Sequence, residues 1–436
     1  MFLLSVFLLS LSTTSTAFMF PKDCVPQPHL PGTCCPSYKG SPCGSALNRG
    51  SCLPVQRSRT ETPTVLLDDR DRCPSFYFNV SCVCKDKFMG PDCGQCKFGR
   101  VGENCDQFIT VVRREIRQFS VVERIQFFAK INYCKKLIDP RYYILRTGDR
   151  FQSYTYKFID ASYYDCWCYY HYYATKPFLQ GNSEFGFLNY AHGSTGFGSW
   201  HRFFLLLLER QMQLCLKDPT FALAFYDWQD DPDCAICGDD MIGGNDKQGR
   251  ISKYSIFSTW RTVCGTTDYR GTYCLMSDCI CERTKVFRRP GMALGFGKPN
   301  RLDVQHCLTI PNIDTPPYDP SSSNSSRCCI EGWRDRNDQR GTSLHNLWHV
   351  YMGGTMSVVP IACNDLMFFL HHCFIDKIFD AHIRRWGITP ASYPNVQVYG
   401  HRAYDCMCPF LECWYHRTMF TQSTTFGYRY DIYNNF

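Results

Sequence analysis

The chain has 436 residues, of which 29 are cysteine and 12 are histidine, and 44% of its residues are hydrophobic. That hydrophobic content excludes a chain that is disordered throughout, and a length of this size predicts two or three domains. Lys and Arg number 47 against 40 Asp and Glu, a net charge of +7. Because the basic residues form no stripe longer than a pair such as Lys135-Lys136, we expect no nucleic-acid partner.

The N-terminus has the pattern of a secretory signal. Residues 2–11 read FLLSVFLLSL, and a small-residue stretch ending at Ala17 follows them. We therefore predict a signal peptide over residues 1–17 and a mature chain in an oxidising compartment. Asn79 and Asn324 each begin an Asn-x-Ser sequon, which fits glycosylation in the secretory pathway. No later segment reaches the roughly 18 apolar residues of a membrane span, so we expect no transmembrane segment in this chain.

Residues 18–107 are rich in cysteine, Gly and Pro and lack apolar periodicity. Their cysteine spacing resembles an EGF-like or laminin-like knot. Such a segment needs covalent cross-links to hold its shape, and zinc bound by Cys-x-x-Cys pairs is the alternative. Because the compartment is oxidising, we predict a small disulfide-rich domain. The cysteines concerned are Cys24, Cys34, Cys35, Cys43, Cys52, Cys82, Cys84, Cys93, Cys96 and Cys105.

From residue 108 to 436 the apolar spacing becomes helical. Residues 109–129, 200–216 and 364–386 are expected to form helices, and the last two are apolar enough to be buried. We expect Asp365 to cap the last of them. The fold class that follows is mainly α, with a helix bundle as the catalytic domain.

Histidines recur in and beside these helices. A single histidine on an apolar face is most often structural, but His345 and His349 are four residues apart and would project from one helix face. His372 follows in another helix. His171, His192 and His201 form a second set of three, so the sequence predicts two metal ions in the bundle.

Imidazole ligands narrow the choice of metal without fixing it. Neutral imidazole suits copper, zinc, iron or nickel, and the absence of a carboxylate from both sets argues against a non-haem iron site. Three histidines and an open position allow catalytic zinc as readily as copper.

The two histidine segments resemble the paired metal-binding motifs of the tyrosinase family, animal type. Residues 192–202 read HGSTGFGSWHR, departing from the first motif at Gly198, and residues 365–376 read DLMFFLHHCFID, departing from the second at Leu366. The resemblance extends to FMGPDCGQCKFG over residues 88–99, the Asp227-Trp228 pair and Cys234-x-x-Cys237. It implies a four-helix bundle that binds two copper ions.

The resemblance also implies roles for individual residues. His171, His192 and His201 correspond to the ligands of the first copper, and His345, His349 and His372 to those of the second. Glu331 and Asn346 match positions thought to hold a water that accepts the phenol proton. The alternative for Glu331 is a surface charge in a loop. His371 should point elsewhere, because adjacent helical residues diverge by about 100°.

Three further side chains are expected around the ligands. Glu209 and Asp376 lie one or two turns beyond His201 and His372, where a carboxylate can accept the second N–H of a metal-bound imidazole. Their alternative is a charge on a helix surface or an ion pair with Arg202, Lys377 or Arg384. Phe368 is expected to wall the site and exclude water.

The implied reaction is oxidation of tyrosine-like phenols and catechols to o-quinones with O₂, as in pigment synthesis, in a melanosome lumen or outside the cell. A zinc-bearing isomerase of the same family and an inactive secreted Cys-rich binding protein are the alternatives. Five cysteines fall outside the family pattern, and we expect extra disulfides or buried thiols there. They are Cys166, Cys168, Cys328, Cys329 and Cys373. The oligomeric state stays open.

Overall fold

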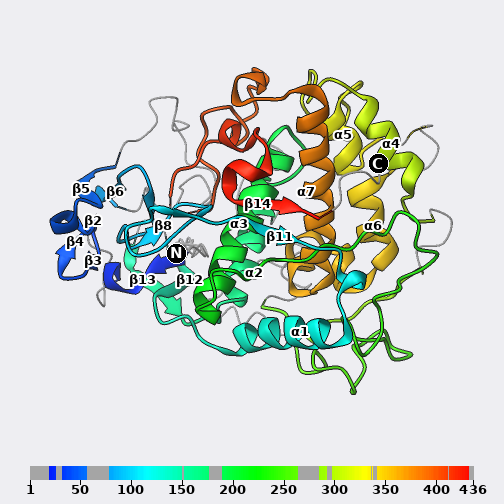
Figure 1. Cartoon of the computed structure of the whole chain (residues 1–436), viewed down its shortest axis with the longest axis horizontal. Coiled ribbons are helices and arrows are strands. Elements are labelled where there is room, and N and C mark those ends of the chain that lie inside the picture. The colour runs from blue at the N-terminus through cyan, green and yellow to red at the C-terminus, as the bar shows by residue number, and fades with distance from the viewer. Residues whose placement is uncertain are drawn as a thin grey trace, which may run out of the picture.

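The computed structural model describes residues 19–25, 32–55, 78–149, 152–175, 189–263, 284–291, 297–334, 336, 341–410 and 412–431. The predicted signal peptide, residues 1–17, lies outside this range. Figure 1 shows a β-rich head on one side of a larger helical body.

The head is built from short strands that disulfides hold together. A three-stranded sheet has the order β2-β6-β5, and three two-stranded ribbons accompany it. The strands are β2 (Thr33–Cys34), β3 (Ser37–Tyr38), β4 (Ser41–Pro42), β5 (Gly50–Pro54), β6 (Val80–Cys84), β7 (Phe88–Met89), β8 (Gln95–Cys96), β9 (Arg100–Val101) and β10 (Gln107–Phe108). The disulfides are Cys24–Cys34, Cys35–Cys52, Cys43–Cys82, Cys84–Cys93 and Cys96–Cys105. The prediction of disulfides rather than zinc is confirmed, because these bonds consume the thiols that zinc would need.

The body is mainly helical, as predicted. Its helices are α1 (Val121–Lys136), α2 (Asp165–Thr175), α3 (Gly196–Leu216), α4 (Arg301–Thr309), α5 (Ser326–Glu331), α6 (Leu344–Met352) and α7 (Met367–Trp386). The long helices α3 and α7 pack against each other, and α5 and α6 also contact α7. At the border with the head, β12 (Tyr142–Asp149) lies between β1 (Met19–Pro21) and β13 (Gln152–Ile159) and pairs antiparallel with both.

The first body helix begins later than the apolar spacing predicted. Residues 109–120 are not α-helical: β11 (Val111–Arg113) pairs in parallel with β14 (Tyr428–Tyr430). The helix begins after Ser120, whose hydroxyl accepts from the backbone N–H of Glu123 while the Glu123 carboxylate accepts from the N–H of Ser120. This reciprocal capping box satisfies two backbone donors that would otherwise be unpaired.

The start of α7 is also corrected. Residues 359–364 form a 3₁₀ turn, α7 begins at Met367, and its N-cap residue is Leu366 rather than Asp365. The Asp365 carboxylate still accepts from the Met367 N–H at 2.9 Å and also pairs with Arg288.

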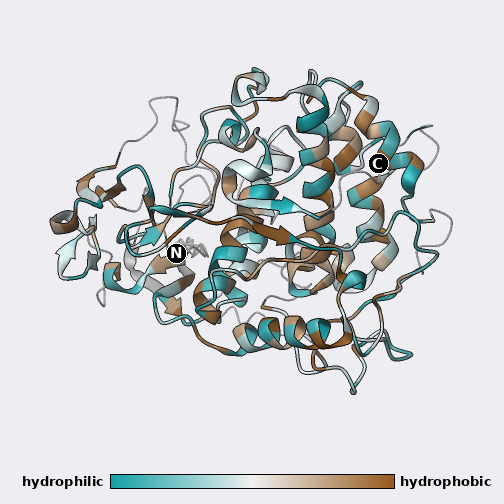
Figure 2. Cartoon of the chain, viewed as in Figure 1, coloured by the Kyte–Doolittle hydropathy of each residue, from teal (hydrophilic) through white to brown (hydrophobic). Residues whose placement is uncertain are grey.

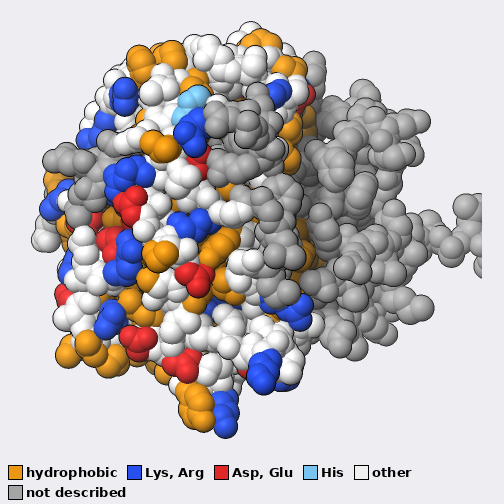
Figure 3. Space-filling view, turned by 90° about the vertical axis from the view of Figure 1, so that its right-hand side faces the viewer, with side chains coloured by type: hydrophobic (Ala, Val, Ile, Leu, Met, Phe, Trp, Pro, Cys, Tyr) orange, Lys and Arg blue, Asp and Glu red, His pale blue; other side chains and the backbone are white. Residues whose placement is uncertain are grey.

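The helices differ in how many of their residues are buried, according to where they lie in the body. Figure 2 shows hydrophilic and hydrophobic residues mixed along α1, which lies on the outside of the body. By contrast, α3 and α7 bury residues on almost all faces. On the face shown in Figure 3, basic, acidic and apolar side chains are intermixed. Within the described part of the chain, no helix has both the length and the apolar character of a membrane span.

Candidate metal centre

The second histidine set converges on one point between α6 and α7. His345 and His349 project from the same face of α6, as their spacing predicted, and His372 reaches them from α7. The Nε2 atom of His372 lies 3.2 Å from that of His345 and 3.3 Å from that of His349. Such separations fit three nitrogens about 2 Å from a single cation in tetrahedral geometry.

The first set combines two helices and a loop. His171 comes from α2, His201 from the first turns of α3, and His192 from the Gly-rich loop before α3. One ligand atom from each lies within 4.8 Å of the others. The rings of His201 and His372 stack with centroids 4.4 Å apart, so the two sets are adjacent. Two metal ions held by these sets would face one another.

Backbone carbonyls orient several of the imidazoles. Nδ1 of His201 lies 2.9 Å from the Phe197 carbonyl, and Nδ1 of His349 lies 2.7 Å from the Met356 carbonyl. A carbonyl can only accept, so each ring carries its proton on Nδ1 and keeps the Nε2 lone pair for a metal. Nε2 of His201 is buried and has no hydrogen-bond partner among the described residues. The donor set therefore fits a metal ion.

Burial keeps these histidines neutral. It lowers the pKa of His201 to about 3 and that of His349 to about 4. It also lowers the pKa of His171, His192, His345 and His372 well below the ordinary value of 6.5. Metal ligation requires the neutral imidazole, so the site is in its binding form at neutral pH.

Two phenylalanines wall the centre. The ring of Phe368 stacks on His372 at a centroid distance of 4.0 Å and meets His171 edge-on at 4.7 Å. Phe197 contacts both His201 and His345, each with centroids 4.8 Å apart. Both phenylalanines are buried. The structure thus places Phe368 where the sequence predicted it, and Phe197 adds a wall that the sequence reasoning missed.

His371 does not point away from the second set as helix geometry predicted. One of its ring nitrogens lies within 4.8 Å of a ring nitrogen of His345, of His349 and of His372. Its Nδ1 atom accepts a hydrogen bond from the indole N–H of Trp228 at 3.0 Å. His371 therefore makes the kind of hydrogen bond that was expected of it, but its ring lies next to the ligands of the second set instead of pointing away from them.

Glu331 and Asn346 flank His345. The Glu331 carbonyl lies 3.2 Å, and the Asn346 side-chain oxygen 2.9 Å, from Nδ1 of His345. Glu331 is fully buried at the end of α5, so it is not a surface charge in a loop. Its carboxylate accepts from the Gly193 N–H at 2.6 Å and pairs with Arg327 at 3.1 Å. Burial raises the pKa of Glu331, against the opposing effect of Arg327.

Glu209 and Asp376 form ion pairs, which was the alternative to hydrogen bonds with the ligand histidines, and Arg202 is among the partners predicted for Asp376. Glu209 pairs with Arg113 at 2.9 Å, and Asp376 pairs with Arg202 at 2.6 Å, all four side chains being buried. Their ion pairs therefore connect β11, α3 and α7. Backbone carbonyls, not these carboxylates, accept hydrogen bonds from His201 and His349. Neither carboxylate is hydrogen-bonded to a ligand histidine in the described structure.

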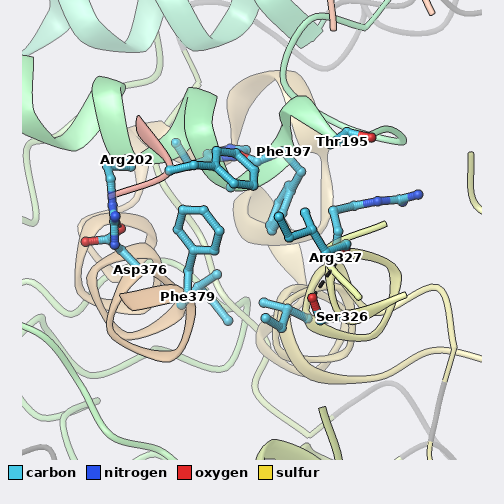
Figure 4. Close-up of a pocket in the computed structure, with 13 residues that line it drawn as sticks. Thr195, Phe197, Arg202, Ser326, Arg327, Asp376 and Phe379 are labelled. Atoms are coloured by element: carbon cyan, nitrogen blue, oxygen red, sulfur yellow. Dashed lines mark hydrogen bonds and ion pairs between the residues drawn. The ribbon is translucent and has the colours of Figure 1, made fainter. Parts of the chain in front are cut away.

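A small cavity lies behind His201, between α3, α5 and α7. Figure 4 shows Phe197 and Phe379 at its centre, with Arg202 and Asp376 on one side and Ser326 and Arg327 on the other. A Cβ atom added to Gly198 would lie 3.2 Å from the Phe379 ring. The departure from the family motif at Gly198 thus allows this aromatic ring to pack closely against α3.

The extra cysteines near the site are mostly buried thiols. Cys329 forms a disulfide with Cys307, whereas Cys166, Cys168, Cys328 and Cys373 are buried free thiols. Burial raises the pKa of Cys328 to about 11 and raises those of Cys166 and Cys373 further. A protonated thiol is a poor metal ligand. These three thiols therefore do not compete with imidazole at neutral pH.

The sequons and the Cys-x-x-Cys pair can be placed as well. Asn79 and Asn324 are both exposed, as a glycan would require. Cys234 and Cys237 form a disulfide.

Comparison with known proteins places these features in context. A family model described as the common central domain of tyrosinase matches residues 161–385. Tyrosinase of Bos taurus is 34% identical over 454 residues, covering 99% of this chain and 85% of that protein. The 5,6-dihydroxyindole-2-carboxylic acid oxidase of Ambystoma mexicanum is 34% identical over 449 residues, covering 95% and 83%. A polyphenol oxidase structure from Thermothelomyces thermophila covers 68% of this chain and 75% of that chain at 16% identity, with a TM-score of 0.44.

Proposed function

The chain belongs to the tyrosinase family, and from this premise we propose that it is a dicopper oxidase that converts tyrosine-like phenols and catechols to o-quinones with O₂. The observation that carries the proposal is the pair of adjacent three-histidine sets. Their members are His171, His192 and His201 for one copper, and His345, His349 and His372 for the other. When bound, the two copper ions supply the redox chemistry that activates O₂.

The protein's own residues set the conditions for that chemistry. All-imidazole ligation gives each metal neutral ligands and leaves a position open. Phe197 and Phe368 pack against the ligand rings and keep water away from them. His192 and His349 are only partly buried, and the other four ligands are buried. We propose that a phenol enters on the side of these two histidines.

Glu331 and Asn346 are proposed to accept the phenol proton through a water. The Asn346 side-chain oxygen and the Glu331 backbone carbonyl both lie at Nδ1 of His345, which supports this. The Glu331 carboxylate accepts from Gly193, next to His192. Glu331 therefore contacts the loop of the first histidine set through its side chain and His345 of the second set through its backbone.

The compartment is proposed from the disulfides and the exposed sequons. A secreted or lumenal protein, in the melanosome or outside the cell, would carry glycans on Asn79 and Asn324. A pigment pathway is the expected setting, because relatives of this chain are named tyrosinase.

The test replaces one ligand in the copper-loaded full chain. His349→Ala should remove one copper and lower catechol oxidation by more than about 100-fold, because losing a ligand exceeds the 10–100-fold cost of losing an outer partner. His306→Ala is the control, since His306 lies on α4 outside both sets. Quinone formation from tyrosine and from L-dopa, together with bound copper, are measured.

Catechol oxidation by His349→Ala at the parent rate would refute the assignment of the site. A parent protein that retains zinc in preference to copper and forms no quinone would instead favour the isomerase alternative.

A further inference from the structure

Trp228 is hydrogen-bonded to His371, the histidine that lies beside the second metal set but is not assigned as a ligand. Trp228 and His371 are both fully buried, and the indole N–H lies 3.0 Å from Nδ1 of His371. An indole N–H can only donate a hydrogen bond, so Nδ1 of His371 must accept through its lone pair. The ring is therefore the neutral tautomer with its proton on Nε2, and neither nitrogen offers a lone pair to a metal.

We propose that Trp228 prevents His371 from becoming a fourth imidazole ligand of the second copper by holding it in the Nε2–H tautomer. This inference rests on the proposed function. It makes Trp228 a positioning residue, which acts through His371 rather than on the substrate.

His371 lies so close to the three ligands that its tautomer must be held fixed if it is not to bind the metal. A ring nitrogen of His371 is within 4.8 Å of ring nitrogens of all three ligands, and its ring stacks on that of His345 with centroids 5.3 Å apart. Only a small side-chain movement separates His371 from ligation. The ligand His349 has the opposite tautomer, because its Nδ1–H donates to a carbonyl and its Nε2 lone pair is left for the metal.

The tryptophan is itself held rigidly. The backbone N–H of Tyr226 donates to the Leu370 carbonyl at 3.1 Å, which fixes this segment against α7 next to His371. Lys298 donates to the Trp228 carbonyl at 3.1 Å. The indole stacks on Trp348 with centroids 5.6 Å apart. An indole fixed in this way can enforce one tautomer of its neighbour.

The consequence concerns the open coordination position. Catalytic sites with three protein ligands leave the fourth position to water or substrate, whereas four protein ligands close a tetrahedral site. Ligation by His371 would therefore occupy the position that O₂ and phenol need. The Asp227-Trp228 motif thereby acquires a role: Trp228 keeps that position open.

The test follows histidine tautomers by two-bond ¹H–¹⁵N spectra of the ¹⁵N-histidine-labelled full chain, both metal-free and loaded with zinc as a diamagnetic probe. His371→Gln identifies the His371 signals. The parent should show Nε2–H at His371 in both states. In Trp228→Phe, zinc should shift the His371 signals as it shifts those of a ligand, and zinc release to a chelator should slow at one of the two sites.

Trp348→Phe is the matched control. It removes an indole N–H from the same aromatic stack without touching the bond to His371, because Nε1 of Trp348 has no hydrogen-bond partner among the described residues. It should leave the His371 signals and zinc release at parent values, and Trp228→Phe/His371→Gln should restore the parent release rate.

An Nδ1–H tautomer in the parent, or His371 signals in Trp228→Phe that zinc does not move while it moves those of the six ligands, would overturn the inference. Failure of the proposed function looks different: zinc would move no histidine signal in the parent, and the metal-free spectrum would still decide the tautomer.

Discussion

Charged side chains in the interior of the body are paired, and their pairing decides their protonation. Asp380 on α7 accepts from Arg384 at 2.7 Å and from the Ser423 N–H at 2.7 Å, and it also pairs with Arg202. Burial favours its neutral form, but the two arginines outweigh burial and hold the pKa of Asp380 below its ordinary value of 3.8. A carboxylate with a lowered pKa stabilises the fold above that value, and its contribution is lost as the pH falls through the folded-state pKa.

Asp380→Asn should therefore lower the free energy of unfolding at pH 7 by about 1.5–3 kcal/mol, because it removes charged hydrogen bonds to Arg202 and Arg384 while Arg202 keeps its pair with Asp376. The difference between the two proteins should shrink as the pH falls below 3.8 toward the lower pKa of the folded carboxylate. Urea unfolding of both proteins at pH 7 and near pH 3 measures this. Asp246→Asn, which breaks an exposed pair with Arg250, is the control and should change little at either pH. A deficit that grows at low pH would contradict the account.

Single residues also show what could be predicted from the sequence. The spacing of His345 and His349 predicts a shared helix face because helical periodicity is local. The pairing of Glu209 with Arg113 could not be predicted, since the two residues are 96 positions apart and the relative rotation of packed helices is set by tertiary contacts. Arg202, by contrast, was among the partners predicted for Asp376. The bond between Trp228 and His371 spans 143 residues and was missed for the same reason.

At the scale of elements, the turn between α5 and α6 fixes the geometry of the second histidine set. Gly332 follows Glu331 with φ +101°, and a Cβ atom there would lie 2.0 Å from the Ser343 carbonyl oxygen. The Ser343 N–H donates to the Gly332 carbonyl at 2.9 Å. This close approach brings the Glu331 carbonyl to His345.

A left-handed backbone conformation alone costs a non-glycine residue about 1–2 kcal/mol. Gly332→Ala should lower the free energy of unfolding by more than this, because the Ser343 backbone must also move away from the added Cβ atom. Gly341→Ala is the matched control: Gly341 has φ +67°, but no atom of the described residues lies within 4 Å of the added Cβ, so we expect the backbone cost alone. Thermal unfolding and copper content are the measurements. Equal stability of the two variants would contradict this role of the turn.

Element boundaries were predictable where a local signal exists. The Ser120–Glu123 capping box is visible in the sequence, yet apolar spacing alone placed the helix start at residue 109. Residues 111–113 became a strand because they pair with residues 428–430, more than 300 positions away. A local sequence pattern cannot predict a strand partner that lies so far away in the chain.

At the scale of the whole molecule, disulfides act in both head and body. Five of them join short strands in the described part of the head, whereas Cys134–Cys215 joins α1 to α3 across 81 positions. Cross-linking distant residues restricts the unfolded chain more than closing a short loop. The helical body therefore gains more from this bond than from Cys406–Cys413, which closes seven positions.

Replacing Cys134 and Cys215 by Ser should destabilise the protein by about 4.5 kcal/mol, and replacing Cys406 and Cys413 by about 2.5 kcal/mol, from loop entropy alone. Denaturant unfolding of the two double variants in parallel measures the order. A larger loss for the short loop would show that native-state packing at Cys406–Cys413 outweighs chain entropy.

Six neutral histidines are proposed to hold a pair of copper ions in this protein. The copper content of the purified full chain, measured together with its rate of catechol oxidation as copper is added, tests this site most directly. We expect two copper ions per chain and an activity that requires both. A chain that binds no copper, or that reaches full activity with one, would refute the dicopper site.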